Sequence, residues 1–475
     1  MTDVTLTDRP AVTAPVVGGV RARLVLGIVL VSYFMIVLDN SIIFTGLPQI
    51  QAGLELSASG LSWVQNAYTL VFGGLLLLGA RAGDLLGRRR VFIAGLLVFA
   101  AASLLVGAAQ NEAWIIAARA MQGVGAAVVA PSSLALISAT FPPGPERSRA
   151  VAAYGTTAGL GASLGLVAGG ALASVWSWRA GFFINVPIGA MLIVAAWRYL
   201  PDTRPRRGRF DLIGALTSTV GMGALVYGIV AAGEHGWTSA AGLVPIAVGV
   251  LVLVVFVADQ ARALQPIMPL RLFASRERSG AAAARLLFAG TMIAFFVFTT
   301  QFLQGVYGWN PLQGGLAFLP MTLVQFGFSL LVPRLTARYG NAVLLTAGLG
   351  FVLAGLAGTT RLDAATSYWA GVAAPMVLIG IGQGLAFGPL TAAGIAGARP
   401  ADAGAASGLV NTAHQLGSTL GVAVLTTASA GAATLAGRVS DAYLGGAVML
   451  AVALIAALVL IMPAERKRRS AAHFD

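Results

Sequence analysis

The sequence predicts an all-α polytopic membrane protein, and three observations carry this prediction. The chain has 475 residues, of which 57% are hydrophobic and only 10% are charged. Its mean hydropathy is +0.84, well above what a soluble protein with one or two cores needs. The 60 glycines fit the same class, because small residues let membrane helices approach closely where lipid gives no hydrophobic drive for association.

Fourteen apolar runs divide the chain, and each is long enough to cross a membrane, which takes about 20 apolar residues. Charges and clusters of Pro and Gly separate the runs. The predicted helices span 24–46, 61–80, 91–109, 114–138, 150–172, 180–199, 211–232, 242–260, 281–305, 314–333, 341–360, 369–392, 405–429 and 443–462.

Two charged connections group these helices as six, two and six. The stretches PDTRPRRGRFD and PIMPLRLFASRER follow the sixth and the eighth helix. Paired six-helix halves are typical of a transporter built from repeats, with its site at the midplane between the halves. The predicted organisation is a cytoplasmic N-tail at 1–23, an N-terminal six-helix bundle at 24–200, a linker with helices 7 and 8 at 201–278, a C-terminal six-helix bundle at 279–462 and a cytoplasmic C-tail at 463–475.

The placement of arginines predicts the orientation of the chain. Most of the 30 basic residues lie in the tails or in loops after even-numbered helices, whereas Arg179, Arg361 and Arg438 lie on the opposite side. Since loops rich in Lys and Arg stay in the cytoplasm, both termini are expected there. Two arginines lie within helices, Arg119 and Arg285, and we expect Arg285, near the start of the ninth helix, to reach the cytoplasmic surface.

The composition excludes several classes of function. Without cysteine, the chain has no disulfide, thiolate metal site or cysteine nucleophile, and its three scattered histidines predict no metal centre. The single lysine, Lys467, lies in the C-tail, so a P-loop is excluded. The +13 charge is spread among loops without interleaved aromatics, so no nucleic-acid partner is expected. No nucleophile, base and orienting group recur at a spacing that predicts an enzyme.

One carboxylate, Asp39, lies within the first apolar run, in the stretch VLDNSIIFTGLP. A charge there costs about 2.5 to 3.5 kcal/mol on insertion scales. Two interpretations are open: Asp39 carries a proton through the membrane, or it is a structural acid bonded to a neighbouring helix. Asp211 and Asp259 lie at predicted helix ends and Glu234 lies in an outer loop, so one proton per transport cycle is the simplest prediction.

Several short segments resemble the signatures of one known family, in that family's order. Each is weak alone, and their order together is strong. They are LDNSIIFTGLP (38–48), WVQNAYTL (63–70), GARAGDLLGRRR (79–90), ARAMQGVGAA (118–127), WSWRAGFFINVPIG (176–189), LQGVYGWNPLQGGLAFLP (303–320) and ASGLVNTAHQLGSTLG (406–421). The chain resembles the fourteen-helix drug:proton antiporter subfamily of the major facilitator superfamily, from its first predicted helix to its last.

The resemblance implies a proton-coupling role for Asp39 together with Arg119. Arg119 and Gln122 lie three residues apart on the fourth helix and so project from one face. By resemblance, Arg119 tunes the proton affinity of the acid when the two approach and part. The alternative is a permanent ion pair or a clamp on backbone carbonyls.

The loop after the second helix resembles the superfamily's loop motif, which implies a conformational latch that locks the outward-open state. Its residues are Asp84, Gly87, Arg88 and Arg89. The alternative is that these arginines only fix the topology.

The fifth helix carries GLGASLGLVAGG, which resembles the family's antiporter motif. Its glycines, Gly161, Gly165, Gly169 and Gly170, are expected to let this helix lie close to its neighbours. Leu166 stands where the motif has a proline, so the kink that proline produces is in doubt.

Aromatic and amide side chains facing a central cavity would suit a lipophilic substrate, because apolar walls give affinity and a few polar groups give orientation. An aromatic residue facing lipid or the core is the alternative in each case, and His414 is either a second protonatable group or a structural histidine. The substrate-binding candidates are Trp63, Asn66, Tyr68, Gln122, Met292, Phe295, Gln301, Gln304, Asn411, His414 and Gln415.

Residues and resemblance together predict a proton-coupled exporter of lipophilic drug-like compounds that works by alternating access. Its expected partners are a small lipophilic substrate, protons and the lipid bilayer. It is expected to act as a monomer in a bacterial plasma membrane, driven by the proton motive force without a cofactor or metal. An exporter or uniporter of an endogenous lipid, metabolite or antibiotic is the alternative, and a membrane scaffold that does not transport is another.

Overall fold

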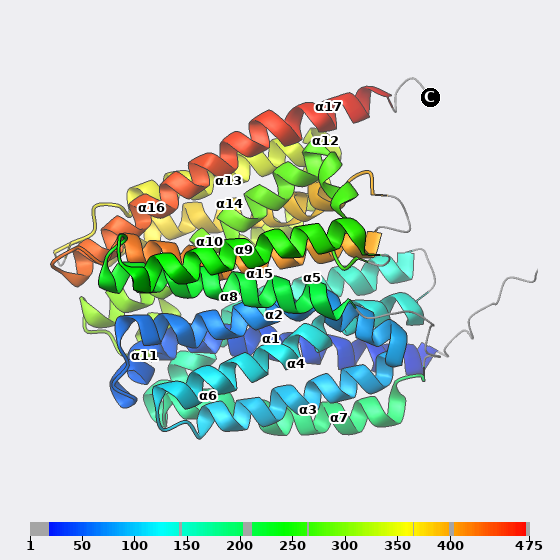
Figure 1. Ribbon diagram of the computed structural model, residues 1–475, viewed down its shortest axis with the longest axis horizontal. Helices are drawn as coiled ribbons and strands as arrows, with labels where there is room; N and C mark the ends of the chain where they lie inside the picture. Colours follow the sequence, from blue (N-terminus) through cyan, green and yellow to red (C-terminus); the bar gives the residue numbers. More distant parts are fainter. Residues whose placement is uncertain are drawn as a thin grey trace, which may run out of the picture.

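The computed structural model describes residues 19–141, 145–202, 211–263, 266–363, 365–398 and 403–471, and all regular structure in these ranges is helical. The helices run side by side along the long axis (Figure 1). They are α1 (Gly19–Gly53), α2 (Ala58–Leu86), α3 (Arg88–Gly107), α4 (Glu112–Thr140), α5 (Pro145–Val175), α6 (Trp178–Phe183), α7 (Asn185–Tyr199), α8 (Leu212–His235), α9 (Ala240–Arg262), η1 (Leu270–Ala274), α10 (Arg276–Gly305), α11 (Pro311–Leu316), α12 (Leu319–Tyr339), α13 (Asn341–Gly358), η2 (Tyr368–Ala373), α14 (Ala374–Ile395), α15 (Ala403–Ala428), α16 (Leu435–Ala456), η4 (Ala457–Ile461) and α17 (Met462–Ala471).

The predicted all-α membrane fold is confirmed. Within the described residues, eleven helical stretches are long and apolar enough to cross a membrane. The helices α2, α5 and α15 occupy the positions of the second, fifth and thirteenth predicted spans. Four predicted spans consist of consecutive helical pieces: α6 with α7, α11 with α12, η2 with α14, and α16 with η4 and α17. The helix order therefore fits fourteen spans.

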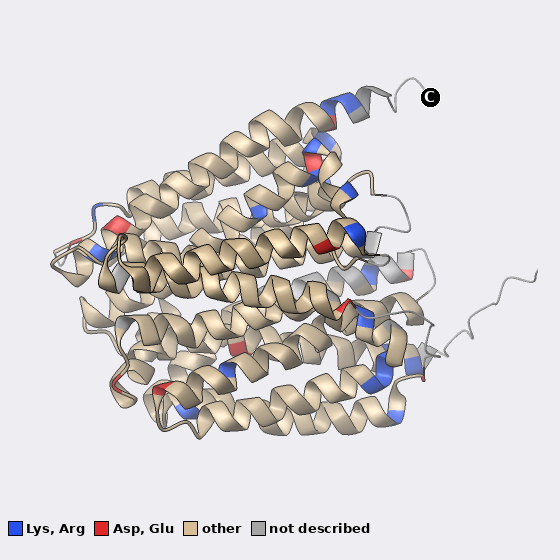
Figure 2. Ribbon diagram, viewed as in Figure 1, with Lys and Arg blue, Asp and Glu red and all other residues tan. Residues whose placement is uncertain are grey.

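Both ends of the described chain lie at one end of the bundle, which we call the proximal end; α1 begins there and α17 ends there (Figure 1). The opposite end, where α1 finishes, is the distal end. Figure 2 shows Lys and Arg gathered mainly at the proximal end, with few charges inside the bundle. This is the pattern that the arginine rule associates with the cytoplasm. The cytoplasmic location of the termini stays a prediction.

Several helices begin earlier than the apolar pattern predicts, and in α16 and α10 a polar residue caps the earlier start. The Thr434 side chain accepts a hydrogen bond from the main-chain N of Gly437, and α16 therefore begins at Leu435. Arg438, predicted to lie in an outer loop, is consequently in the first turn of α16. Ser275 caps α10 in the same way, so that this helix begins at Arg276 instead of residue 281.

The helices pack as a first group, α1–α7, and a second group, α10–α17. Among the described residues, the hydrogen bonds Gln304–Thr45, Leu312–Ser174 and Thr69–Thr419 join the groups, and all involve residues in the distal half or near mid-length of their helices. Gln304 Nε2 donates to the carbonyl oxygen of Thr45 at 2.8 Å. The main-chain N of Leu312 donates to Ser174 Oγ at 3.0 Å. The hydroxyls of Thr69 and Thr419 lie 2.6 Å apart.

The hairpin of α8 and α9 lies against the line where α2 of the first group meets α15 of the second, which we call the α2–α15 seam. On this seam α8 places Met222, Val226 and Val230 in one buried apolar cluster with Leu70 of α2 and Ala423 of α15. In contrast, α9 is the least buried of the eleven apolar stretches. The two extra helices thus cover one side of the contact between the groups, with α9 outermost.

Candidate functional site

Asp39 lies inside the first group, 20 residues after α1 begins, and its side chain is 0% exposed. Three side chains donate hydrogen bonds to its carboxylate. Arg119 Nη1 reaches Oδ2 at 3.0 Å, Gln122 Nε2 reaches Oδ1 at 2.8 Å, and Asn185 Nδ2 reaches Oδ1 at 2.6 Å. The carboxylate is therefore neutralised by one guanidinium and oriented by two amides.

Arg119, also 0% exposed, has several partners besides the acid. Its Nε donates to the carbonyl oxygen of Val64 at 3.0 Å, and its Nη1 donates to Gln122 Oε1 at 2.7 Å. The guanidinium lies over the ring of Tyr68, 4.3 Å from the ring centre. Its Nη2 has no hydrogen-bond partner among the described residues. The arginine thus has carbonyl acceptors on α2 and α4 that remain if it leaves the carboxylate.

Two glycines on α4 let its neighbours approach this pair. A Cβ on Gly123 would lie 2.6 Å from the carbonyl oxygen of Tyr68 on α2, and a Cβ on Gly125 would lie 2.7 Å from the main-chain N of Phe99 on α3. Any larger residue would push the helices apart. The ARAMQGVGAA segment therefore supplies both the charge and the close packing that encloses it.

Asn185, which the sequence interpretation missed, is the third donor to Asp39. It is the first residue of α7, directly after the break at Ile184 that separates α6 from α7. Its position inside the apolar span predicted at 180–199 could have marked it as a site residue, since a buried polar side chain needs a hydrogen-bond partner. Its own Oδ1 has no partner among the described residues.

This geometry allows a specific chemistry. A buried acid and base that neutralise each other are stable together, but loss of either charge leaves the other uncompensated, which costs about 3 to 5 kcal/mol. Protonation of Asp39 would therefore release Arg119 toward its carbonyl acceptors, and deprotonation would draw it back. The expected pairing of Arg119 with the acid of the first helix is present. The role of the pair in proton coupling stays a prediction.

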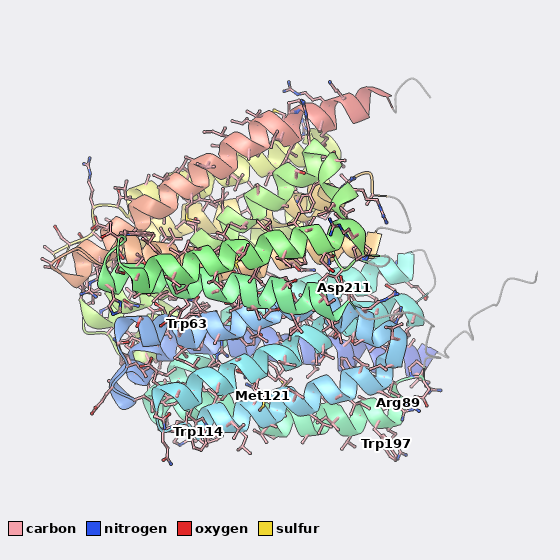
Figure 3. All side chains as sticks on the ribbon, viewed as in Figure 1. Trp63, Arg89, Trp114, Met121, Trp197 and Asp211 are labelled. Carbon is pink, nitrogen blue, oxygen red and sulfur yellow. The ribbon has the colours of Figure 1, made fainter. Side chains whose placement is uncertain are left out.

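The substrate-binding candidates on α2 and α4 lie in different surroundings. Gln122 and Tyr68 belong to the Asp39 site, as described above. Asn66 is buried, and neither of its amide atoms has a partner among the described residues. Trp63 lies near the distal end and its ring faces Tyr227 of α8, with ring centres 6.3 Å apart (Figure 3). It thus belongs to the α2–α15 seam.

The candidates on α10 also divide. Met292 and Phe295 are core residues of the second group, and Phe295 packs on Tyr443 with ring centres 5.5 Å apart. The Gln304 amide donates the hydrogen bond to the carbonyl oxygen of Thr45 that joins the two groups. Gln301 is half-buried between these two regions of the helix.

The candidates on α15 lie where this helix meets α2 and α14. The main chain of Gly73 approaches the Cβ of Gln415 closely. Asn411 donates to the carbonyl oxygen of Ser407 on its own helix at 3.2 Å. The ring of His414 packs edge-on against Phe387 of α14, with ring centres 6.0 Å apart. The eleven candidates therefore do not form a single site, and their role in binding stays a prediction.

The loop predicted to be a latch is a tight turn between α2 and α3. Gly87 has φ +97°, a left-handed conformation that favours glycine. Arg88 Nη1 donates to the carbonyl oxygen of Ala135 on α4 at 2.7 Å, and Arg89 forms an ion pair with Asp202 at 3.0 Å. These contacts stay within the first group or at its end. The side chain of Asp84 lies outside the described residues, so the latch stays a prediction.

The glycines of α5 lie where this helix crosses its neighbours. A Cβ on Gly165 would lie 2.6 Å from the Cβ of Ser41, and one on Gly169 would lie 2.7 Å from the Cα of Ile42, both on α1; Gly161 packs against Val37 of the same helix. Gly170 instead packs against α11 of the second group. Leu166 is buried, and α5 is one continuous helix from Pro145 to Val175.

The prediction that Arg285 reaches the cytoplasmic surface is wrong. Because α10 begins at Arg276, Arg285 lies nine residues inside the helix, and its side chain is 2% exposed. Its guanidinium lies over the ring of Phe387, 3.9 Å from the ring centre. A residue two and a half turns inside a helix is too deep for its side chain to reach water by extension alone.

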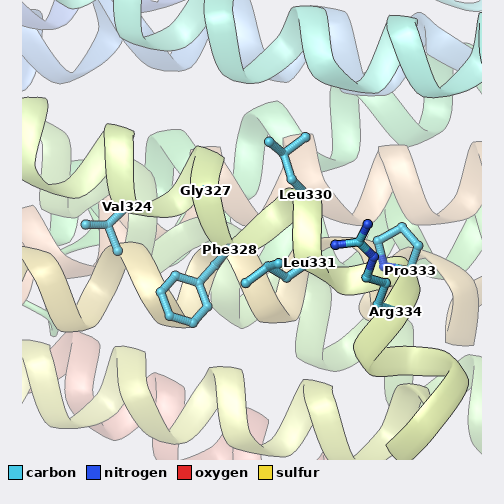
Figure 4. A pocket seen from close by; sticks show the side chains of 7 residues that line it. All are labelled: Val324, Gly327, Phe328, Leu330, Leu331, Pro333 and Arg334. Carbon is cyan, nitrogen blue, oxygen red and sulfur yellow. The ribbon is translucent and has the colours of Figure 1, made fainter.

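A pocket of about 710 Å³ lies along the middle of α12 (Figure 4). Its walls are mainly apolar, with an arginine at the proximal end; they are Val324, Gly327, Phe328, Leu330, Leu331, Pro333 and Arg334. The pocket contains no residue of the Asp39 site and no predicted substrate-binding residue. All of its lining residues belong to α12, and we assign it no function.

Comparison with known proteins agrees with this architecture. The Major Facilitator Superfamily profile matches residues 29–422. The chain is 40% identical to the cephamycin export protein CmcT of Amycolatopsis lactamdurans over 435 residues, which cover 89% of this chain and 90% of that protein. It is 40% identical to the puromycin resistance protein pur8 of Streptomyces alboniger, with 85% and 81% covered.

A solved structure has the same fold at low identity. The crystal structure of the human organic anion transporter MFSD10 (TETRAN) superposes with a TM-score of 0.63 at 16% identity, covering 92% of this chain and 99% of that one. The match in fold, the family profile and the two bacterial relatives lead to one conclusion. The chain belongs to the Major Facilitator Superfamily and is a membrane transporter.

Proposed function

We propose that the protein exports small lipophilic compounds from the cell in exchange for protons that enter through Asp39. The observation that carries this proposal is the buried pair of Asp39 and Arg119, with two amides that hold the carboxylate in place. An intramembrane charge pair is costly to keep in a scaffold and useful in a proton carrier. The relatives named for cephamycin export and puromycin resistance support export of a drug-like compound.

Alternating access would proceed by rocking of the first group against the second. The hydrogen bonds between the groups favour a conformation closed at the distal end. With cytoplasmic termini, a compound would then enter from the cytoplasmic side. The protein would work as a monomer, with the proton motive force and no cofactor.

The energetics suit this exchange. One proton that moves down a potential of 100 mV releases about 2.3 kcal/mol. For a neutral compound this corresponds to a concentration ratio of about 50. One deep acid per cycle is therefore sufficient for export against a moderate gradient.

The test is a measurement of internal pH in proteoliposomes when candidate lipophilic compounds, with and without a charge, are added. We expect the native protein to move protons in response, and the variant Asp39→Asn to lose at least nine-tenths of this signal while it still binds the compound. The matched control is Asp441→Asn, an exposed acid on α16, which should behave as the native protein does. Unchanged proton movement in Asp39→Asn would contradict the proposal and favour a structural role for the acid.

A further inference from the structure

Arg285, in the second group, is a buried arginine that has no acid beside it among the described residues. Its side chain is 2% exposed. Among the described residues, ion pairs join Arg89 to Asp202 and Arg119 to Asp39, and none reaches Arg285. Its Nε has no partner, and its Nη1 lies 3.5 Å from the carbonyl oxygen of Phe387, at the limit of a hydrogen bond. The positive charge is thus left with one aromatic face and one weak acceptor.

Two further polar side chains belong to the same region. The ring of His414 on α15 packs edge-on against Phe387, the ring that the Arg285 guanidinium covers, with ring centres 6.0 Å apart, and its Nδ1 has no partner among the described residues. Tyr33 lies on α1, the helix of the first group that packs against α10. We call Tyr33, Arg285, Phe387 and His414 the Arg285 cluster. It joins one helix of the first group with three of the second.

The Arg285 cluster has an exposed aromatic wall. Phe387 is 40% exposed, and Tyr33 and His414 are half-buried. The rings of Tyr33 and Tyr154 stack at 3.9 Å on the first group's side of the cluster. A ligand that enters between the groups would meet aromatic surfaces first and the buried guanidinium at their base.

The N–H donors of the Arg285 guanidinium indicate which kind of ligand would bind there. A guanidinium has five N–H donors in a planar fork that matches a carboxylate, and a buried charge is stabilised most by an opposite charge that also accepts its hydrogen bonds. The Tyr33 hydroxyl can donate as well. The aromatic rings suit an apolar body attached to that carboxylate.

We propose that the Arg285 cluster binds the carboxylate of the exported compound, so that the substrates are amphipathic organic acids. The proposal rests on the proposed function, because it names the substrate class of that transporter. It adds a second charge to the cycle: export of a monoanion against one proton moves two elementary charges in the same electrical direction, whereas export of a neutral compound moves one.

The test compares two fluorescent probes that differ only in charge, dansyl-leucine and its neutral primary amide. Binding to the purified full-length protein in phosphatidylcholine nanodiscs is measured by fluorescence titration, without a proton gradient. We expect the native protein to bind the carboxylate at least tenfold more tightly than the amide. We expect Arg285→Gln to weaken carboxylate binding at least tenfold and to change amide binding less than twofold.

The control variant Arg361→Gln removes the same charge from an exposed loop and should leave both affinities unchanged. If Arg285→Gln does not fold, His414→Gln provides the second test, with at least a threefold loss for the carboxylate alone. Equal affinity of the native protein for both probes, including no binding of either, would overturn the proposal. So would an equal loss of both in Arg285→Gln.

Two further measurements distinguish this proposal from a lipid headgroup site and from a failure of the proposed proton exchange. If phosphatidylglycerol in the nanodisc abolishes carboxylate binding, the cluster is a lipid headgroup site and the proposal is overturned. If the carboxylate binds through Arg285 but moves no protons in proteoliposomes, the anion site is supported and the proposed proton exchange fails. If protons do move, their dependence on membrane potential should be steeper for the carboxylate probe than for the amide.

Discussion

The two groups of helices treat a buried arginine in opposite ways. In the first group, Arg119 meets Asp39 at 3.0 Å, and both side chains are fully buried. In the second group, Arg285 lies over Phe387 and has no ion pair among the described residues, while one buried acid, Glu465, lies on another helix and binds the start of α13. Charges of both signs are thus present in each group, but the buried arginine is paired with an acid in the first group and, among the described residues, not in the second. A neutralised pair suits a proton switch, and an unpaired cation suits a ligand.

The largest expected effect tests this contrast directly. Arg119→Gln leaves the carboxylate of Asp39 buried without its cation, so we expect the free energy of unfolding to fall by about 3 to 5 kcal/mol. Arg285→Gln leaves no charge behind, and a loss of about 0.5 to 2 kcal/mol of cation–π attraction is offset by the removed desolvation cost. Thermal melting and unfolding titration in mixed micelles would measure both variants.

A double variant sharpens the same comparison. Asp39→Leu combined with Arg119→Met replaces the pair with apolar side chains, and we expect it to recover most of the stability that Arg119→Gln loses. If Arg285→Gln instead destabilises the protein as much as Arg119→Gln does, then Arg285 has a structural partner and the contrast between the groups is wrong.

The next effect concerns Asn185, the donor 2.6 Å from Asp39. A hydrogen bond to a charged group contributes about 1.5 to 3 kcal/mol, so Asn185→Ala should lower the free energy of unfolding by that amount. The control is Asn411→Ala in the second group, whose amide bonds only a carbonyl of its own helix among the described residues. It should change the stability by less than about 0.5 kcal/mol. Melting temperatures in one detergent would rank the two variants, and equal losses would show that Asn185 does not specifically support the acid.

A smaller effect is expected from the packing that holds α1, the helix of Asp39, in place. Gly165→Leu on α5 would force a side chain into Ser41 and Leu38 of α1, and overpacking of this kind costs about 1 to 3 kcal/mol. Gly327→Leu on α12 is the matched control, because a Cβ there has nothing within 4 Å. We expect the melting temperature of Gly165→Leu to fall below that of Gly327→Leu. If Gly165→Leu is as stable as the control, α1 and α5 can separate at a low cost in free energy.

The sequence predicted the class and the helix positions, because both depend on local pattern, and the family resemblance implied the pair of Asp39 with Arg119. Asn185 was missed because its direction depends on the break between α6 and α7. Arg285 was predicted to reach the surface because the apolar run begins only at residue 281. The helix α10 in fact begins five residues earlier, at Arg276, where Ser275 caps it. Trp63 faces α8 because the extra hairpin packs on the α2–α15 seam, a tertiary contact that no short motif encodes.

The smallest expected effect tests how the second group compensates the buried acid Glu465. The Glu465 carboxylate accepts hydrogen bonds from the main-chain N of Asn341 at 3.1 Å and of Ala342 at 2.6 Å, at the start of α13. A negative charge at a helix N-terminus contributes about 0.3 to 1 kcal/mol when exposed and up to about 2 kcal/mol when partly buried. Glu465→Gln removes the charge and one of the two acceptor oxygens, so we expect a loss near the upper end of this range. Glu55→Gln, in an exposed distal turn, should cost nothing measurable by melting. A loss as large as that of Arg119→Gln would mean that Glu465 compensates a full positive charge, and the second group would then hold a charge pair of its own.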